Sequence, residues 1–311
     1  MVDGGAEGVS QLKDVHAVRA YPTGFHLVNR AGALVLAAPC AFCLRRPILV
    51  DMIDVVPIRL GAVNAYLLKG ERPALVDSGY PGMEERILDA IIAAGEEPSR
   101  LSLIIITHAH TDHYGSAAAL RLITGANVAC GDRAAADLKA GVDRHLVPVG
   151  PSGFAARSLL SLVSKGMGPS AALEPDLIFS GPADLSRWGV DASIVPTPGH
   201  TPGSISVVPG TAAAVAWAVV SKLPAGTEAE APFVAEFPWA VVGDLVFGRF
   251  TSPRRPRLPL FAADARALAA NLRVFTETEV VYPGHGGPLR GADLAAMAEA
   301  ADRLSERRSR S

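Results

Sequence analysis

Ionisable side chains are concentrated in one short stretch of the sequence, IIITHAHTDHYGS at residues 104–116. Three of the chain's eight histidines, His108, His110 and His113, lie here together with Asp112. At the end of a strand, residues i and i+2 point the same way, so His108 and His110 can face one point. Asp112 and His113, on the following turn, can face a neighbouring point. Imidazole and carboxylate groups suit a divalent cation such as Zn²⁺, and burying four of them without partners would cost stability. The spacing therefore predicts a metal site.

Three further potential ligands lie near strand ends elsewhere in the chain. His200 falls in the turn PTPGHTPGS, Asp244 follows an apolar run in VVGDLVF, and His285 follows the last predicted strand in VVYPGHGGP. Loops that rigid elements hold in place are where binding and catalytic residues are expected. The other three histidines have no such context, and we expect them on the surface or in a cap: His16, His26 and His145.

The elements that must position these residues follow a regular pattern from residue 53 onward. Short apolar runs bounded by turn residues alternate with segments of helical spacing, which predicts an α/β layered domain over residues 52–311. The run at 101–107 is apolar almost throughout and predicts a strand that is buried on both faces. The strands predicted next to the other candidate ligands are 192–197, 204–210, 239–247 and 278–284.

Three segments interrupt this pattern. Residues 1–51 are weakly patterned and form a predicted N-terminal extension, with Met52 as an alternative start of the chain. Residues 141–180 contain a helical piece bracketed by Gly and Pro and no evident strand, which favours a cap. Their apolar side chains could line a substrate pocket or pack on the domain. Residues 211–238 are interpreted as a surface insertion or a long hairpin.

The order of these motifs resembles the metallo-β-lactamase-fold hydrolase superfamily. His-x-His-x-Asp-His, Pro-Gly-His-Thr-Pro-Gly, Gly-Asp and Pro-Gly-His-Gly follow one another, and the resemblance covers roughly residues 53–295. It implies a four-layered αββα sandwich with a dinuclear metal site along one edge. It also implies that Asp77, in VDSG, supports a ligand histidine from behind. By motif, the first metal would be held by His108, His110 and His200, the second by Asp112, His113 and His285, and both by a bridging Asp244.

The resemblance also implies a reaction. A hydroxide bridging two metals would attack an ester, thioester or lactone of a small molecule, with Asp112 as the catalytic residue that orients it or moves a proton. Asp244, where common lactamases have Cys, favours glyoxalase II-like, lactonase-like and phosphodiesterase-like members. The open alternatives are phosphodiester or β-lactam hydrolysis, a mononuclear iron enzyme similar to persulfide dioxygenases, and a non-catalytic module. Zn²⁺ is the expected metal, and iron or manganese would fit the same ligands.

The composition of the chain limits the classes of partner and the cellular compartment that we expect. A net charge of -2 gives no general attraction to nucleic acid or anionic membranes, so we expect neither as a partner. Three cysteines, an odd and sparse number, favour a reducing compartment, and we expect the cytoplasm. The sequence predicts no oligomeric state and no particular substrate-binding residue. Two arginine clusters are expected to be a solvated loop and a frayed terminus: Arg254, Arg255 and Arg257, and Arg307, Arg308 and Arg310.

Overall fold

The computed structural model describes most of the predicted domain, with five internal gaps. The described residues are 54–143, 147–149, 153, 172–210, 237–249 and 251–309, together with the backbone of three strands before them. Met52, most of the predicted cap and residues 211–236 of the predicted insertion lie outside the described residues. The early strands form an antiparallel sheet in the order β1-β2-β3, with bounds Val15–Tyr21, Gly24–Asn29 and Leu34–Ala37.

The first of two larger sheets has six strands in the order β10-β8-β7-β6-β5-β4. Their bounds are Leu177–Phe179, Asn127–Gly131, Leu103–Ile106, Ala74–Val76, Asn64–Leu68 and Val55–Arg59. The expectation that 141–180 contains no strand is wrong, because β10 pairs in parallel with β8 at the edge of this sheet. The strand has only three residues, too few for a periodic signal, and its Ile178 is exposed although it is apolar.

The second sheet has five strands in the order β11-β12-β13-β14-β18. Their bounds are Ala183–Asp184, Ala192–Pro196, Ile205–Pro209, Trp239–Gly243 and Val280–Pro283. β12 and β13 form an antiparallel pair, whereas β14 and β18 run parallel, so the ends of β14 and β18 reach the same edge. Two small strand pairs flank this sheet: β15 with β16 (Phe247–Gly248 and Pro256–Arg257) and β9 with β17 (Val147–Pro148 and Phe261–Ala262).

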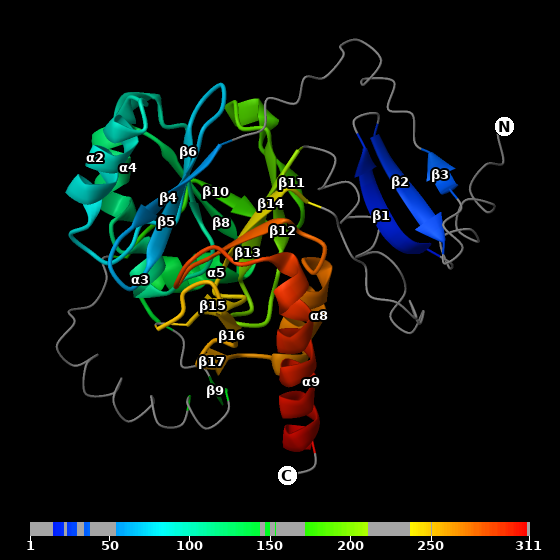
Figure 1. The fold of residues 1–311 in the computed structure, drawn as a ribbon. Coiled ribbons are helices and arrows are strands. Elements are labelled where there is room, and N and C mark those ends of the chain that lie inside the picture. The colour runs from blue at the N-terminus through cyan, green and yellow to red at the C-terminus, as the bar shows by residue number, and fades with distance from the viewer. Residues whose placement is uncertain are drawn as a thin grey trace, which may run out of the picture.

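Helices cover the outer face of each sheet (Figure 1). The helices on the first sheet are α2 (Glu84–Ala93), α4 (Ala117–Thr124) and α5 (Asp132–Ala140). The second sheet is covered by α8 (Ala265–Val274) and α9 (Ala295–Ser309). The described residues also form four shorter helical turns: α3 (Thr111–Tyr114), η3 (Pro98–Arg100), η5 (Ser186–Trp188) and η6 (Gly291–Leu294).

Alternation along the central strands divides the core into three apolar clusters. In β7, Ile104 and Ile106 pack against α2, α4 and α5, whereas Leu103 and Ile105 face the second sheet, as the period of two in a strand requires. In β14, Val241 faces the first sheet and Val242 packs against α8 and α9. The layers are therefore helix, sheet, sheet, helix, which confirms the predicted αββα sandwich.

The two sheets are joined by backbone hydrogen bonds at one edge. The N–H of Ile205 donates to the carbonyl of Thr107 at 2.9 Å, and the N–H of Asn64 donates to the carbonyl of Gly284 at 2.8 Å. Thr107 follows β7, and Gly284 follows β18. The strand ends that carry the candidate ligands thus meet along this seam.

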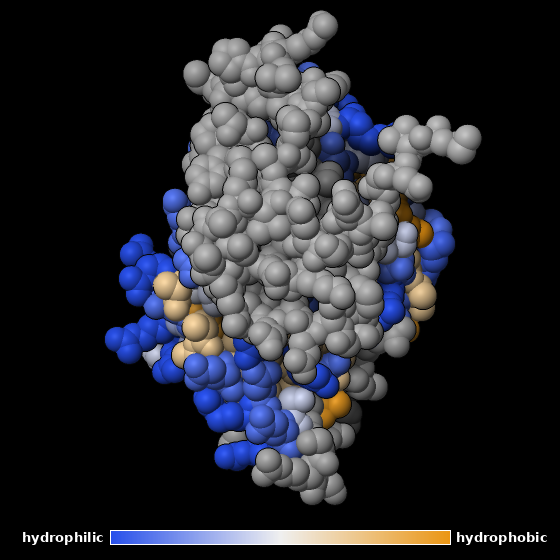
Figure 2. All heavy atoms as spheres, turned by 90° about the vertical axis from the view of Figure 1, so that its right-hand side faces the viewer, coloured by the Kyte–Doolittle hydropathy of each residue, from blue (hydrophilic) through white to orange (hydrophobic). Residues whose placement is uncertain are grey.

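The described surface is largely polar. On the face seen in Figure 2, the described side chains are mostly hydrophilic, with small apolar areas between them. The most exposed large apolar side chains among the described residues include Ile92, Leu122 and Ile123 on α2 and α4. Within the described part of the chain, no helix has both the length and the apolar content that crossing a bilayer would require.

Truncation of a residue between the two sheets tests the layer assignment. Ile105 is 0% exposed and packs between the sheets, so Ile105→Ala is expected to lower the free energy of unfolding by about 2–5 kcal/mol through lost contacts and a residual cavity. Ile123 is 56% exposed, and Ile123→Ala is the matched control with little effect. Equal effects in urea titrations of the two variants would contradict the buried position of Ile105.

Candidate metal centre

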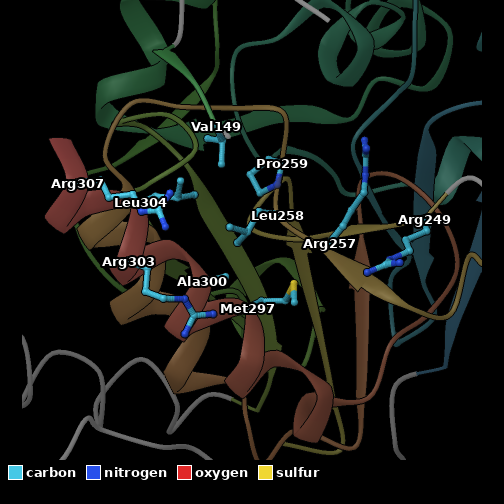
Figure 3. A pocket seen from close by; sticks show the side chains of 10 residues that line it. All are labelled: Val149, Arg249, Arg257, Leu258, Pro259, Met297, Ala300, Arg303, Leu304 and Arg307. Atoms are coloured by element: carbon cyan, nitrogen blue, oxygen red, sulfur yellow. The ribbon is translucent and has the colours of Figure 1, made fainter. Parts of the chain in front are cut away.

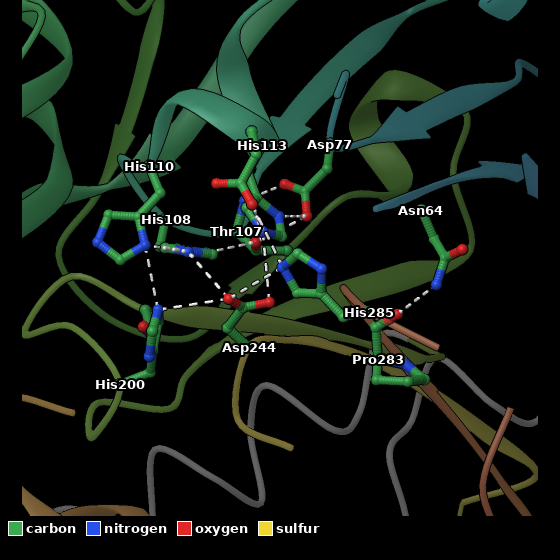
Figure 4. A network of polar contacts seen from close by, with 12 residues as sticks. Asn64, Asp77, Thr107, His108, His110, His113, His200, Asp244, Pro283 and His285 are labelled. Atoms are coloured by element: carbon green, nitrogen blue, oxygen red, sulfur yellow. Dashed lines mark hydrogen bonds and ion pairs between the residues drawn. The ribbon is translucent and has the colours of Figure 1, made fainter. Parts of the chain in front are cut away.

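All seven side chains predicted as metal ligands gather at the seam between the sheets. Figure 4 labels all of them except Asp112. They form two neighbouring groups, and the potential ligand atoms within each group lie within 4.8 Å of one another. Each side chain comes from a strand end, from the short helix α3 or from the β12–β13 turn. The first group contains His108, His110, His200 and Asp244, and the second contains Asp112, His113 and His285.

The first group brings three imidazole nitrogens together. Nδ1 of His110 lies 3.0 Å from Nε2 of His108 and 3.1 Å from Nε2 of His200. Oδ2 of Asp244 lies 3.8 Å from Nε2 of His108 and 3.4 Å from Nε2 of His200. Four ligand atoms about 2.0–2.1 Å from a tetrahedral Zn²⁺ stand about 3.3 Å apart, so these spacings fit one such cation.

Asp244 also reaches the second group. Its Oδ1 lies 3.3 Å from Nε2 of His113, and its Oδ2 lies 3.5 Å from Nε2 of His285. Asp112 Oδ2 lies 3.3 Å from Nε2 of His285 and 3.8 Å from Nε2 of His113. One carboxylate between two sets of ligands is the arrangement that a bridging ligand needs.

Buried atoms in the cluster lack conventional partners. Nε2 of His113 and Oδ1 of Asp244 are buried and form no hydrogen bond of good geometry with any described residue. The nitrogen pairs around His110 are separated by little more than 3 Å, so each pair must share a proton or a cation to avoid lone-pair repulsion. The donor set and these orphaned atoms therefore fit divalent cations.

Asp77 fixes two of the imidazole rings from behind. Its Oδ2 accepts a hydrogen bond from Nδ1 of His113 at 2.8 Å and another from Oγ1 of Thr107 at 2.8 Å. Because the Thr107 hydroxyl donates to Asp77, it can accept from Nδ1 of His108, 3.0 Å away. Both rings then direct Nε2 into the cluster, which is how an outer partner selects the tautomer of a ligand histidine.

Backbone carbonyls orient two other rings in the same way. Nδ1 of His200 lies 2.8 Å from the carbonyl oxygen of Phe261, and Nδ1 of His285 lies 2.8 Å from that of Ala62. Donation from each Nδ1 leaves Nε2 free to act as a ligand. His110 differs, because it presents Nδ1 to the cluster.

Two supporting residues escaped the sequence analysis. Asn64 donates from Nδ2 to the carbonyls of Pro283 and Gly286 at 3.0 and 2.8 Å, and so holds the turn that carries His285. Thr107 links Asp77 to His108. A buried Asn at the start of a strand and a Thr at the end of one are common in sequences, so neither had a signal. Tyr114, which follows the histidine motif directly, packs in the core at 2% exposure, as expected for its ring.

Burial and charge divide the histidines into two kinds. Burial lowers the pKa of His108 well below its usual value, lowers that of His110, and lowers that of His200 to about 4. Burial also acts on His113 and His285, but neighbouring carboxylates, Asp244 foremost, outweigh it. They raise the pKa of His113 well above its usual value and that of His285 to about 10. At neutral pH, without a cation, His113 and His285 are therefore protonated.

Binding of a cation should therefore release protons. Loading the metal-free protein with Zn²⁺ at pH 7 is expected to release about two protons, from His113 and His285, and the affinity should fall as the pH is lowered. Calorimetric titration in two buffers of different ionisation enthalpy measures the number released. His285→Gln should release about one fewer. Release of no protons by the unmodified protein would contradict the assignment of these two charges.

Gly284 allows a second test, because its missing side chain leaves room for two ligands. A Cβ at this position would stand 2.3 Å from Oδ1 of Asp244 and 2.5 Å from Cε1 of His113. Gly284→Ala is therefore expected to displace both ligands and weaken Zn²⁺ binding by about 10–100-fold. Gly181→Ala is the control, because a Cβ there meets no atom within 4 Å. Equal affinities of the two variants in competition with a chelator would refute the predicted crowding.

Comparison with curated proteins gives partial matches. The chain is 29% identical over 146 residues to the uncharacterized protein YobT of Bacillus subtilis, which covers 46% of this chain and 55% of that protein. It is 31% identical over 150 residues to hydroxyacylglutathione hydrolase of Anaeromyxobacter dehalogenans, which covers 47% of this chain and 42% of that protein. The chain thus spans about half the length of these two relatives.

Solved structures share the fold at low sequence identity. A metallo-beta-lactamase of Cronobacter sakazakii with substitutions in its HARLDQ motif has a TM-score of 0.52 and 17% identity, over 82% of this chain and 93% of that chain. A B3 metallo-beta-lactamase described as having an active-site glutamic acid has a TM-score of 0.51 and 20% identity, over 82% of this chain and 87% of that chain. At these identities the similarity shows a shared fold.

The family follows from a match that includes the first histidine motif. The family model of the metallo-beta-lactamase superfamily matches residues 58–213, just over half of the chain, and this range contains five of the seven predicted ligands. The fold of the solved structures agrees with it. The chain belongs to the metallo-beta-lactamase superfamily.

Proposed function

We propose that this protein is a metal-dependent hydrolase that holds two divalent cations and cleaves an ester, thioester or lactone of a small molecule. The observation that carries the proposal is the pair of ligand groups that share Asp244. In this assignment His108, His110 and His200 hold one cation, and Asp112, His113 and His285 hold the other. The nitrogen-rich donor set favours zinc, although iron and manganese accept the same ligands.

Bound divalent cations supply Lewis acidity for a developing oxyanion and lower the pKa of water at the site. The chain's own residues supply positioning and proton transfer. The pKa of Asp112 lies at about 2, because His113 and His285 together outweigh its burial, so the carboxylate is ionised at neutral pH. It can therefore accept a hydrogen bond from an attacking water molecule and orient it, and we propose that it also moves the proton.

The accessible side of the cluster is the side where Asp112 lies. The Asp112 side chain is 20% exposed and that of His285 is 14% exposed, whereas that of Asp244 is 4% exposed. His108 and His113 are buried beneath them. A substrate that approaches past Asp112 and His285 would bring its reacting carbonyl next to both ligand groups, as the proposed reaction requires.

The name of one relative supports an acyl compound as the substrate. One relative is named as a hydroxyacylglutathione hydrolase, and it matches about half of this chain at 31% identity. We extend from that name only the class of bond. The composition supports the remaining elements of the proposal: a small-molecule substrate in a chain of net charge -2, and a cytoplasmic location for a chain with three cysteines.

Metal content and substrate preference test the proposal together. Purified protein should contain about two zinc ions per chain, lose activity on chelation and regain it with Zn²⁺. Asp112→Asn should lower kcat by about 100-fold or more on the best substrate from a panel of thioesters, lactones, phosphodiesters and a β-lactam. Asp89→Asn, at an exposed position on α2, should leave kcat unchanged.

The outcomes separate the alternatives. One iron ion per chain, with oxygen-dependent turnover, would replace the proposal with a mononuclear redox enzyme. Turnover of only the phosphodiester or only the β-lactam would keep the metal centre but change the bond that is cleaved. Full activity of Asp112→Asn on the preferred substrate would refute the role of Asp112.

A further inference from the structure

A pocket of about 410 Å³ lies between helix α9 and the β15–β16 pair (Figure 3). Its volume is within the range of small-molecule sites. Arg303 and Arg307 enter from α9, while Arg249 and Arg257 come from the chain around β15 and β16. Within the described part of the chain, no acidic residue lines it. Four arginines therefore line one pocket, two on each side of it.

The structure brings together two parts of the sequence that looked unrelated. Arg257 belongs to the first predicted arginine cluster and Arg307 to the second. The expectation of a frayed terminus is wrong for Arg307, because α9 continues to Ser309. Glu299 lies 3.5 Å from Arg303, but both side chains are more than 60% exposed, so this ion pair leaves the Arg303 guanidinium available to a second anion.

Apolar side chains form the rest of the pocket. Leu258, Met297 and Leu304 are partly buried, and each packs against the core cluster of the second sheet. A fully hydrated anion such as sulfate would leave the exposed parts of these side chains in contact with water. The lining therefore fits an anionic group that is attached to an apolar part.

Aromatic contacts connect this pocket to the candidate metal centre. The guanidinium carbon of Arg257 lies 5.3 Å from the ring centre of Phe247. The ring centre of Phe247 in turn lies 4.5 Å from that of His285 and 6.5 Å from that of His200. The Phe247 side chain thus separates Arg257 from two metal-ligand candidates, which is a distance that one small molecule can span.

We propose that the pocket between α9 and β15–β16 binds a phosphate group on a short apolar stem, as the part of the substrate that is not cleaved. This inference rests on the proposed hydrolase function. One arginine can donate two hydrogen bonds to a pair of phosphate oxygens. A site with several arginines matches the two negative charges of a phosphate better than the single charge of a carboxylate ligand. The small concave volume favours a phosphorylated metabolite over an extended polyanion.

Direct binding of hexyl phosphate to metal-free protein tests the pocket without requiring catalysis. Calorimetry at low ionic strength should show binding that weakens by about tenfold or more in Arg303→Gln/Arg307→Gln, and also in Arg249→Gln on the opposite wall. Hexanol should bind far more weakly than hexyl phosphate. Arg86→Gln/Arg187→Gln removes the same charge at two exposed sites elsewhere and should bind like the unmodified protein.

Two further measurements distinguish failure of this inference from failure of the proposed hydrolase function on which it rests. His110→Ala/His200→Ala should retain hexyl phosphate binding, which excludes the metal-ligand cluster as the phosphate site. In the metal-loaded enzyme, hexyl phosphate should inhibit ester hydrolysis competitively, and the arginine variants should lose this inhibition. Equal binding by the pocket variants and the unmodified protein would overturn the inference while hydrolysis stands. Pocket-dependent binding in a protein that hydrolyses nothing would refute the proposed function, and with it the link to a substrate.

Discussion

Five imidazole rings and two carboxylates crowd one largely buried cluster, and the balance of their charges is the constraint on which the site depends. Three nitrogens stand 3.0–3.1 Å from a neighbour, too close for unshared lone pairs. Burial keeps His108 and His200 neutral by lowering the pKa of each, whereas carboxylates keep His113 and His285 protonated by raising theirs. Divalent cations satisfy both kinds of histidine. They replace the protons on His113 and His285, and they bind the lone pairs of the neutral His108 and His200.

The residues that orient these rings also join the two sheets. Asp77 follows β6 and contacts His113 and Thr107, and the carbonyl of Thr107 accepts the N–H of Ile205 from the second sheet. Asn64 of the first sheet holds the turn after β18 in the same way. The ligand geometry is therefore set by the sheet packing that buries the core between the layers, and a change in the sheet spacing would alter the metal–ligand distances.

Much of the fold could be predicted from the sequence, because strand and helix periods leave clear signals where elements are long and buried. The run around Leu103 and Ile105 is one example, and its alternation matches the observed layers. Short elements gave no signal: β10 has three residues with Ile178 exposed, and β15, β16 and β17 have two each. In such strands the pairing partner, rather than local preference, decides the conformation.

The residues of the site also divide into those with a clear sequence signal and those without one. Metal coordination restricts ligands to a few residue types at fixed strand ends, so the seven side chains could be recognised by spacing and motif. Asn64 and Thr107 act through hydrogen bonds that many residue types could make, and no sequence pattern marks them. The arginine pocket is less constrained still, because Arg257 of β16 and Arg307 of α9 are far apart in the sequence and line one pocket only in the folded chain. Residues that determine the chemistry thus lie on turns at the strand ends of the two rigid sheets, whereas those that would select a substrate lie on a helix and short strands outside these sheets. Relatives can therefore share the metal ligands and still differ in what they cleave.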